Sequence, residues 1–199
     1  MKLNILILTH NRPILFKRCL TSVLNNLPEY VNIIVNNDSC DIEEVHHKQI
    51  EYFYYSSKNL SNVYKFLFDK IKENDHIMFL EDDDYIVKNF YNNLQYNHTS
   101  PDLTYMNFVP VNLNEYQRND FKIETVNNLF QLSQMVFKKS CCTTFPVDND
   151  IHNDWVLFQN VLENAKTIET IKTPMFIQTV DGKDNISFKE YNKDERFNS

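Results

Sequence analysis

The stretch "DHIMFLEDDDYIVKNF", residues 75–90, decides the fold prediction because an apolar run leads directly into a group of acids. The run from Ile77 to Leu80 has the character of a strand that is covered on both faces of a sheet. Four consecutive acids follow, from Glu81 to Asp84. Their like charges repel one another, and a surface turn would form more easily from Asn, Gly or Ser. The stretch therefore requires an explanation beyond turn formation.

Two interpretations of these acids are open at the level of local sequence. Mg²⁺ and Mn²⁺ prefer carboxylate oxygens and keep coordination positions open for phosphate oxygens, and a bound cation would remove the repulsion. The alternative is a solvated acidic turn, whose charges favour the dipole of a following helix. The position directly after a buried strand favours the cation site.

The chain before the acids alternates between predicted strands and predicted helices. A helix is expected to begin at Pro13 and to stop at Pro28, and a second is expected from Ser61, its N-cap, to Lys72. The strands are expected at residues 3–8, 31–35, 50–55 and 76–80. This alternation predicts an α/β fold with a mainly parallel central sheet that is flanked by helices.

Three polar clusters follow predicted strands: "THNRP" at residues 9–13, "NNDS" at 36–39 and "EDDD" at 81–84. Ligands of such sheets bind beyond the carboxyl ends of the strands. We therefore expect the three clusters to converge on one cleft.

The second half of the chain is predicted to be more mixed. Helices are expected at residues 87–96 and 151–162, strands at 103–109, 121–125 and 134–137, and two short strands within 168–179. The sequence contains no repeat and no low-complexity linker. We therefore expect one domain over residues 1–187, followed by a polar C-terminal tail over 188–199.

Composition excludes several classes of function. The 199 residues include one glycine, Gly182, so glycine-rich loops that cradle a phosphate, as in Rossmann and P-loop proteins, are nearly excluded. The net charge of -7 and the lack of a basic run disfavour nucleic-acid binding. No apolar segment approaches the length of a membrane span, and the N-terminus is interpreted as a strand rather than a signal peptide. The four cysteines form no CxxC motif and are expected to be reduced cytosolic thiols.

Five segments, taken in their order and spacing, resemble the family 2 glycosyltransferases of the GT-A fold. They are "LNILILTHNRPILFKRCLTSVLNN", "VNIIVNNDS", "KNLSNVYKF", "IMFLEDDD" and "HNDWVLF". Each segment is weak alone, but together they cover most of the chain from Leu3 to about Ser187. The resemblance implies a GT-A domain and a metal-dependent, inverting hexosyl- or pentosyltransferase. It also implies Mn²⁺ or Mg²⁺ as cofactor and a nucleotide-sugar donor, usually a UDP-sugar.

The resemblance also implies which residues bind the donor. "THNRP" is similar to the family's first nucleotide-binding loop, near the base and ribose, and "NNDS" is similar to its "DDGS" turn. Asn replaces both acids of that turn and leaves the preferred base open, although an amide both donates and accepts and can read a uracil edge. "KNLSNVYK" is similar to the start of the helix that faces the nucleotide. The implied donor-binding residues are Thr9, Asn11, Arg12, Asn36, Asn37, Asp38, Asn62, Lys65, Glu81 and Asp82.

Two further motifs imply the metal ligand and the catalytic base. "EDDD" is similar to the family's DXD region, with Asp83 as the metal-binding acid. "HNDW" is similar to its "EDW", with Asp154 as the base, Asn153 in place of Glu, and Trp155 and His152 on the acceptor side. The alternatives are a capping role for Asp154 at a helix N-terminus and a core position for Trp155.

Two other functions remain open. One is a non-catalytic nucleotide-sugar-binding module with the same fold, which the substitutions in "DDGS" and "EDW" keep open. The other is a metal-dependent phosphohydrolase, although those with an aspartyl nucleophile carry "DxD" after the first strand rather than the fourth. The acceptor is open between a saccharide, a lipid-linked glycan, a protein and a hydroxymethylated base of phage DNA, which the acidic net charge disfavours. The expected location is the cytoplasm, bacterial or that of a host cell for a phage or viral enzyme.

Overall fold

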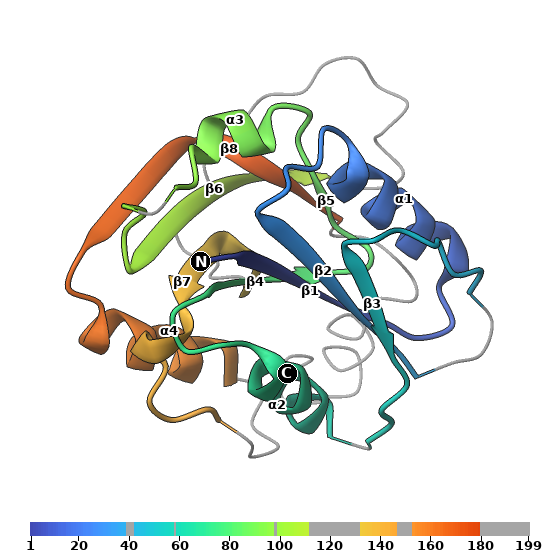
Figure 1. Ribbon diagram of the computed structural model, residues 1–199, viewed down its shortest axis with the longest axis horizontal. Helices are drawn as coiled ribbons and strands as arrows, with labels where there is room; N and C mark the ends of the chain where they lie inside the picture. Colours follow the sequence, from blue (N-terminus) through green and yellow to red (C-terminus); the bar gives the residue numbers. More distant parts are fainter. Residues whose placement is uncertain (39–41, 58, 98, 112–131, 147–152, 180–199) are drawn as a thin grey trace, which may run out of the picture.

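The computed structural model describes residues 1–38, 42–57, 59–97, 99–111, 132–146 and 153–179. The strands of these residues form one sheet in the order β3-β2-β1-β4-β7-β6-β8-β5, with helices on both of its faces (Figure 1). Four strand pairs are parallel, and β7 and β5 run antiparallel to their neighbours. The predicted α/β fold with a mainly parallel sheet and a mixed C-terminal part is confirmed.

The parallel half of the sheet brings the polar clusters to one edge. Strand β1 (Leu3–Thr9) lies between β2 (Val31–Asn37) and β4 (His76–Glu81), and β3 (Ile50–Phe53) pairs with the outer side of β2. Leu8 is in register with Asn36 of β2 and with Glu81 of β4. The three strands therefore end together, which brings Thr9, Asn37 and Glu81 to one edge of the sheet, as predicted. The cleft expected at this edge stays a prediction.

The mixed half continues from β4 through β7 (Met135–Lys138) to β6 (Leu103–Val111), β8 (Ile168–Thr179) and β5 (Tyr85–Ile86). The two short strands expected at 168–179 are one strand, so that prediction is wrong. Its pairing with β6 shifts register at Asn107, opposite Pro174. A proline cannot donate to a strand ladder and is accommodated at such irregularities, so the strand continues past Pro174. The strand predicted at 121–125 and the tail after residue 187 lie outside the described residues.

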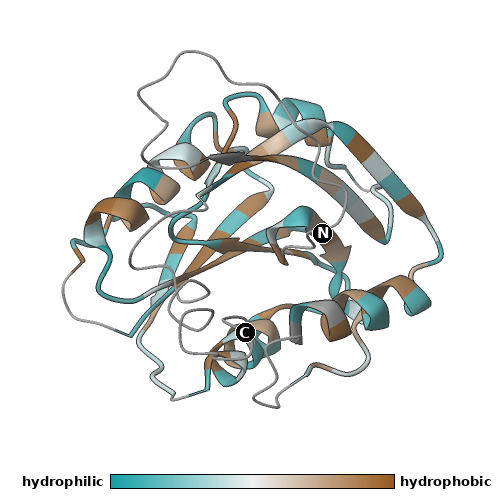
Figure 2. Cartoon of the chain, turned by 180° about the vertical axis from the view of Figure 1, so that it is seen from behind, coloured by the Kyte–Doolittle hydropathy of each residue, from teal (hydrophilic) through white to brown (hydrophobic). Residues whose placement is uncertain are grey.

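Helices cover both faces of the sheet because successive strand residues point to opposite sides. Ile5 and Ile7 pack with α1 (Pro13–Leu24) and α3 (Phe90–Leu94). Leu6 packs with α2 (Leu60–Lys70) and α4 (Asn153–Asn164). Ile5, Leu6 and Ile7 are all fully buried, so this strand is covered on both of its faces, and Figure 2 shows hydrophobic residues along the central strands. The 3₁₀ turns Leu132–Gln134 and Lys139–Cys141 flank β7.

Three helix predictions need correction. Helix α1 ends at Leu24 rather than at Pro28, and Asn26 follows in the left-handed region with φ 58°. Ile14 is 83% exposed although it is apolar, whereas Phe16 is buried. The helix predicted at 87–96 is only Phe90–Leu94. It ends where Gln95 adopts φ 48°, a left-handed conformation that is common at helix ends.

Helix α2 begins at Leu60, and its N-cap is Asn59 rather than the predicted Ser61. The Asn59 side chain accepts a hydrogen bond of 2.9 Å from the main-chain N–H of Ser61. Both residue types are favoured caps, so the local sequence does not distinguish them. None of the helices in the described part of the chain has the length and apolar character that a membrane crossing needs.

Asn59→Ala should lower the free energy of unfolding by about 1 kcal/mol, because the first turn of α2 loses its side-chain acceptor. Asn59→Asp is the matched control, since it keeps an acceptor oxygen and adds a charge that the helix dipole favours. Urea unfolding of both variants and the wild type measures the effect. Equal losses in the two variants would contradict the assignment of the cap.

His76 begins β4 at the sheet edge opposite to the acids and is buried. Its Nε2 lies 2.8 Å from the main-chain oxygen of Pro101, which only accepts, so Nε2 carries a proton. The hydroxyl of Tyr96 lies 3.1 Å from Nδ1. Burial lowers the pKa of His76 below its ordinary value, Lys138 adds to this effect, and the Pro101 oxygen and the charges of Asp102 and Asp75 oppose it.

The stability of the protein should therefore contain a contribution from neutral His76 that is lost as the pH falls. The unfolded chain takes up a proton near pH 6.5, before the folded chain does, so stability falls from that pH down to the depressed folded pKa. Urea unfolding at pH 7.5 and pH 5.5 should show a larger loss in the wild type than in His76→Gln. Carboxylates with raised pKa values make the folded state more stable as the pH falls. They do so equally in the wild type and in His76→Gln, so their effect cancels when the two pH-dependent changes are compared. Identical pH dependence in both would overturn the assignment.

Candidate functional site

Glu81, Asp82, Asp83 and Asp84 are here called the acid cluster. Glu81 ends β4, and the three aspartates connect β4 to β5. Asp82, Asp83 and Asp84 are 4%, 3% and 1% exposed. Aspartates are rarely buried to this degree unless their charges are paired. The alternative of a solvated acidic turn is therefore wrong for these three residues.

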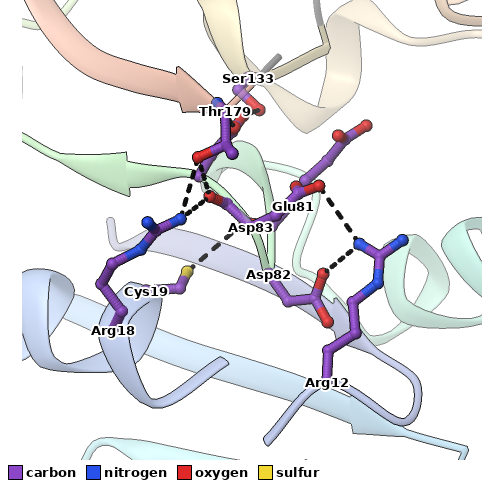
Figure 3. A network of polar contacts seen from close by, with 9 residues as sticks. Arg12, Arg18, Cys19, Glu81, Asp82, Asp83, Ser133 and Thr179 are labelled. Atoms are coloured by element: carbon purple, nitrogen blue, oxygen red, sulfur yellow. Dashed lines mark hydrogen bonds and ion pairs between the residues drawn. The ribbon is translucent and has the colours of Figure 1, made fainter. Parts of the chain in front are cut away.

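One arginine pairs directly with the carboxylates of the cluster. Nη1 of Arg12, in the loop between β1 and α1, lies 2.9 Å from Oδ1 of Asp82 and 3.3 Å from Oδ2 of Asp83 (Figure 3). The sequence resemblance implied that Arg12 lies near the base and ribose of the donor. In the structure its guanidinium lies against the acids, which belong to the same polar edge.

A second arginine, which the sequence analysis did not single out, reaches the cluster from α1. Nη2 of Arg18 donates to the main-chain oxygen of Asp83 and, at 2.9 Å, to the hydroxyl of Thr179 at the end of β8 (Figure 3). Its guanidinium also lies 4.7 Å from the centre of the Tyr85 ring. One sequence signal could have found it: Arg18 follows Leu15 by three residues and precedes Cys19, so it lies next to the apolar face of the helix.

The acid cluster keeps an excess of negative charge, because four carboxylates face two guanidinium groups. Burial raises the pKa of Glu81 well above its ordinary value, and the neighbouring charges of Asp84 and Asp83 raise it further. Burial and the charge of Asp83 raise the pKa of Asp84 in the same way. Burial raises the pKa of Asp82 to about 6, although Arg12 opposes the shift. An additional positive charge would relieve this cost.

The geometry of the cluster fits a divalent cation. Glu81, Asp83 and Asp84 each offer one carboxylate oxygen, and these oxygens lie within 4.8 Å of one another. Oδ1 of Asp83 is buried and has no hydrogen-bond partner among the described residues, which is costly for a charged oxygen. Carboxylate oxygens are the ligands that Mg²⁺ and Mn²⁺ prefer. The cluster therefore resembles a DXD motif in its residues and in its position.

The predicted donor-binding residues of β1 and its loop lie along this edge. Thr9 is buried at the end of β1, beside Asp82. Asn11 is exposed and adopts φ 51°, and its side-chain nitrogen lies 3.0 Å from Nε2 of His10. The other ring nitrogen of His10 contacts the carboxylate of Asp38, which follows β2. His10 therefore links the ends of the two strands.

The side chain of Asn36 is held by the backbone of the segment after β3. Asn36 and Asn37 are both buried at the end of β2. The Asn36 amide donates to the main-chain oxygen of Tyr55 at 2.9 Å and accepts from its N–H at 3.0 Å. This side chain therefore fixes the segment after β3, and its amide is engaged with the backbone.

The two predicted residues of α2 lie in its first turns. The Asn62 amide lies 3.5 Å from the hydroxyl of Ser57. Lys65 pairs with Asp69 one helical turn later, at 2.6 Å. Such exposed pairs stabilise a helix only weakly, so Lys65 can exchange this partner for another anion at low cost.

Asp154 lies in the first turn of α4 and is half-buried. Burial raises its pKa, and its charge lies close enough to Glu81 to raise the pKa of that residue too. Asp154 therefore lies within electrostatic range of Glu81, which precedes it by 73 residues in the sequence. Its place in the first turn also suits the helix dipole. His152 and the side chain of Trp155 lie outside the described residues.

Comparison with known proteins identifies the fold. No protein-family model and no curated protein matches the sequence significantly. The solved structures that it resembles include S. aureus TarS 1–349 in complex with UDP-GlcNAc, with 12% identity and a TM-score of 0.65 over 94% of this chain. The same protein in complex with UDP gives 14% identity and a TM-score of 0.61 over 91% of this chain.

The chain spans 61% of the length of the TarS 1–349 chain and 37% of the longer TarS structure. At this level of identity the likeness shows the fold alone. The chain has the GT-A fold of TarS, a family 2 glycosyltransferase, as the sequence resemblance predicts.

Proposed function

We propose that the protein is a metal-dependent, inverting glycosyltransferase that moves a sugar from a nucleotide-sugar, expected to be a UDP-sugar, to a hydroxyl group of an acceptor. The observation that carries this proposal is the buried acid cluster at the carboxyl edge of a GT-A sheet. Within it, Oδ1 of Asp83 has no hydrogen-bond partner among the described residues. The TarS complexes with UDP and UDP-GlcNAc support the nucleotide class.

Glu81, Asp83 and Asp84 would hold the cation, which would be Mn²⁺ or Mg²⁺. When bound, such a cation neutralises the charge that develops on the leaving diphosphate. Arg12 keeps a second positive charge beside the same acids, and its planar guanidinium suits the oxygens of a phosphate group. Asp82 accepts from Arg12 and holds it in this place.

Asp154 acts in this proposal as the general base that accepts the proton of the acceptor hydroxyl. A general base contributes about 10²- to 10⁴-fold in rate, and it works best when its pKa approaches the working pH. Burial raises the pKa of Asp154 in that direction. The attack of the deprotonated oxygen on the anomeric carbon, from the side opposite the leaving diphosphate, inverts that carbon. Trp155 and His152 remain proposals for the acceptor side.

The remaining residues predicted to bind the donor have two kinds of role: Asn36 supports the main chain of the site, and the others are proposed to contact the donor directly. Asn36 supports the segment after β3 through the Tyr55 backbone. Thr9, Asn11, Asn37 and Asp38 are proposed to contact the base and ribose. Asn62 and Lys65 are proposed to approach the nucleotide from α2.

The free thiols of Cys19, Cys141 and Cys142 support a reducing compartment such as the cytoplasm. The acceptor is proposed to be a saccharide, a lipid-linked glycan, a protein or a hydroxymethylated base of phage DNA.

A non-catalytic nucleotide-sugar-binding module is the second candidate. The observation that favours it is that Asn36, at the first acid position of the "DDGS" turn, has its amide engaged with the main chain. Donor binding without turnover would distinguish it. The acids follow β4 rather than β1, which continues to disfavour an aspartyl phosphohydrolase.

UDP together with Mn²⁺ should raise the melting temperature of the wild type more than either alone. A ligand at one hundred times its Kd stabilises the folded state by about 2.7 kcal/mol, and each kcal/mol corresponds to roughly 2–4 °C for a chain of this size. Asp83→Asn should remove the part of the shift that depends on Mn²⁺, since it removes a charged ligand. Thermal unfolding with UDP, GDP, CMP and TDP, each with and without Mn²⁺, measures these effects.

The control for this experiment is Glu163→Gln, which removes an exposed acid of α4 and should keep the full shift. A full Mn²⁺-dependent shift in Asp83→Asn would remove Asp83 from the metal site. No shift of the wild type with any nucleotide would overturn the proposed function.

Asp154→Asn should keep the shift with UDP and Mn²⁺ but lower the release of UDP from a UDP-sugar, in the presence of acceptor, by about 10²- to 10⁴-fold. The amide has nearly the same shape but cannot accept the proton. Glu163→Gln on the same helix again serves as the control. Unchanged UDP release by Asp154→Asn would exclude Asp154 as the base.

A further inference from the structure

The main-chain oxygen of Asp83 is held by two donors from distant parts of the chain. Nη2 of Arg18 donates to it from α1, and the hydroxyl of Thr179 donates to it from β8 at 2.7 Å. Nη2 also donates to the Thr179 hydroxyl at 2.9 Å, so the three groups form a closed triangle (Figure 3). A carbonyl oxygen has two lone pairs, and both are used here. We call this arrangement of Arg18, Thr179 and the Asp83 oxygen the clamp.

The clamp continues to the next acid of the cluster. The main-chain N–H of Thr179 donates to Oδ1 of Asp84 at 3.0 Å. The hydroxyl of Ser133, in the 3₁₀ turn before β7, lies 3.5 Å from Oδ2 of the same carboxylate. The end of β8 therefore fixes the main chain at Asp83 and the carboxylate at Asp84 together.

Arg18 differs from Arg12 in the atoms that it uses. Among the described residues, no carboxylate oxygen lies within ion-pair distance of Arg18, whereas Arg12 binds carboxylate oxygens of Asp82 and Asp83. Arg18 instead packs over the Tyr85 ring, a favourable place for a cation. Burial raises the pKa of Asp83 and of Asp84, and the charge of Arg18 opposes this shift. It thus reduces the repulsion within the cluster and leaves the carboxylate oxygens available.

We propose that Arg18 and Thr179 are positioning residues that hold the acid cluster in the geometry that a divalent cation requires. This inference rests on the proposed function, because it assigns the clamp a role toward the cation of that site. Residues that orient metal ligands without touching the metal typically change metal affinity or activity by about 10- to 100-fold when they are mutated. Neither residue was implied by the sequence motifs.

Two variants test the clamp through Mn²⁺ binding rather than through activity. Arg18→Met removes the charge and both of its hydrogen bonds. Thr179→Val removes only the hydroxyl and keeps the main-chain N–H that holds Asp84, so it is the milder change. Lys17→Met is the matched control, because it removes the same charge from the neighbouring, exposed position of α1. Electron paramagnetic resonance of free Mn²⁺, with and without UDP, gives the Kd, and near-UV circular dichroism checks that each variant is folded.

We expect Mn²⁺ binding to weaken at least about tenfold in Arg18→Met and in Thr179→Val, and to stay at the wild-type level in Lys17→Met. The Arg18→Met, Thr179→Val double variant should lose less Mn²⁺-binding free energy than the sum of the losses in the two single variants. The reason is that both donors bind the same oxygen. If the folded Thr179→Val and Arg18→Met variants bind Mn²⁺ with wild-type affinity, the positioning role of the clamp is wrong and the proposed function still stands. Failure of the wild type to bind Mn²⁺ would overturn both this inference and the metal-dependent function on which it rests.

Discussion

The burial of like-charged carboxylates between β4 and β5 is the constraint on which the rest of this site depends. Asp82, Asp83 and Asp84 are almost fully withdrawn from water, and each loses the solvation that stabilises its charge. Arg12 and Arg18 offset part of this cost. Such a turn is stable only if the chain delivers positive charge and donors to it from elsewhere, so the site and the tertiary fold require one another.

The two halves of the sheet contribute different parts of that support. The parallel half ends β1, β2 and β4 at one edge, which brings Arg12 to the acids across 70 residues of sequence. The mixed half brings the end of β8 to Asp83 across 96 residues and positions α4, which carries Asp154. The acids lie where the two halves join. In the proposed reaction the donor side therefore belongs mainly to the parallel half, and the base comes from the mixed half.

Local sequence was sufficient for the central strands and for the position of the acids, and it failed where two local solutions are nearly equal. Asn59 and Ser61 are both good caps, and the structure uses Asn59. Residues 87–96 suggested one helix, but the hydrogen bond from the N–H of Val87 to the oxygen of Met175 keeps the start of this segment beside β8. Two short strands were predicted at residues 168–179, but a shift of register opposite Pro174 lets one strand continue through this segment.

The sequence by itself determined that strands buried on both faces alternate with helices, and that three polar clusters follow β1, β2 and β4, because hydrophobic runs and strand ends are local properties. Only the tertiary structure decided that the acids are buried, that Arg12 pairs with them, that Asn36 binds the Tyr55 backbone, and that Arg18 and Thr179 share the oxygen of Asp83. The physical reason is distance along the chain. A hydrogen bond between residues that are 19 to 96 positions apart leaves no periodicity in the sequence, since it depends on the order and register in which the strands assemble.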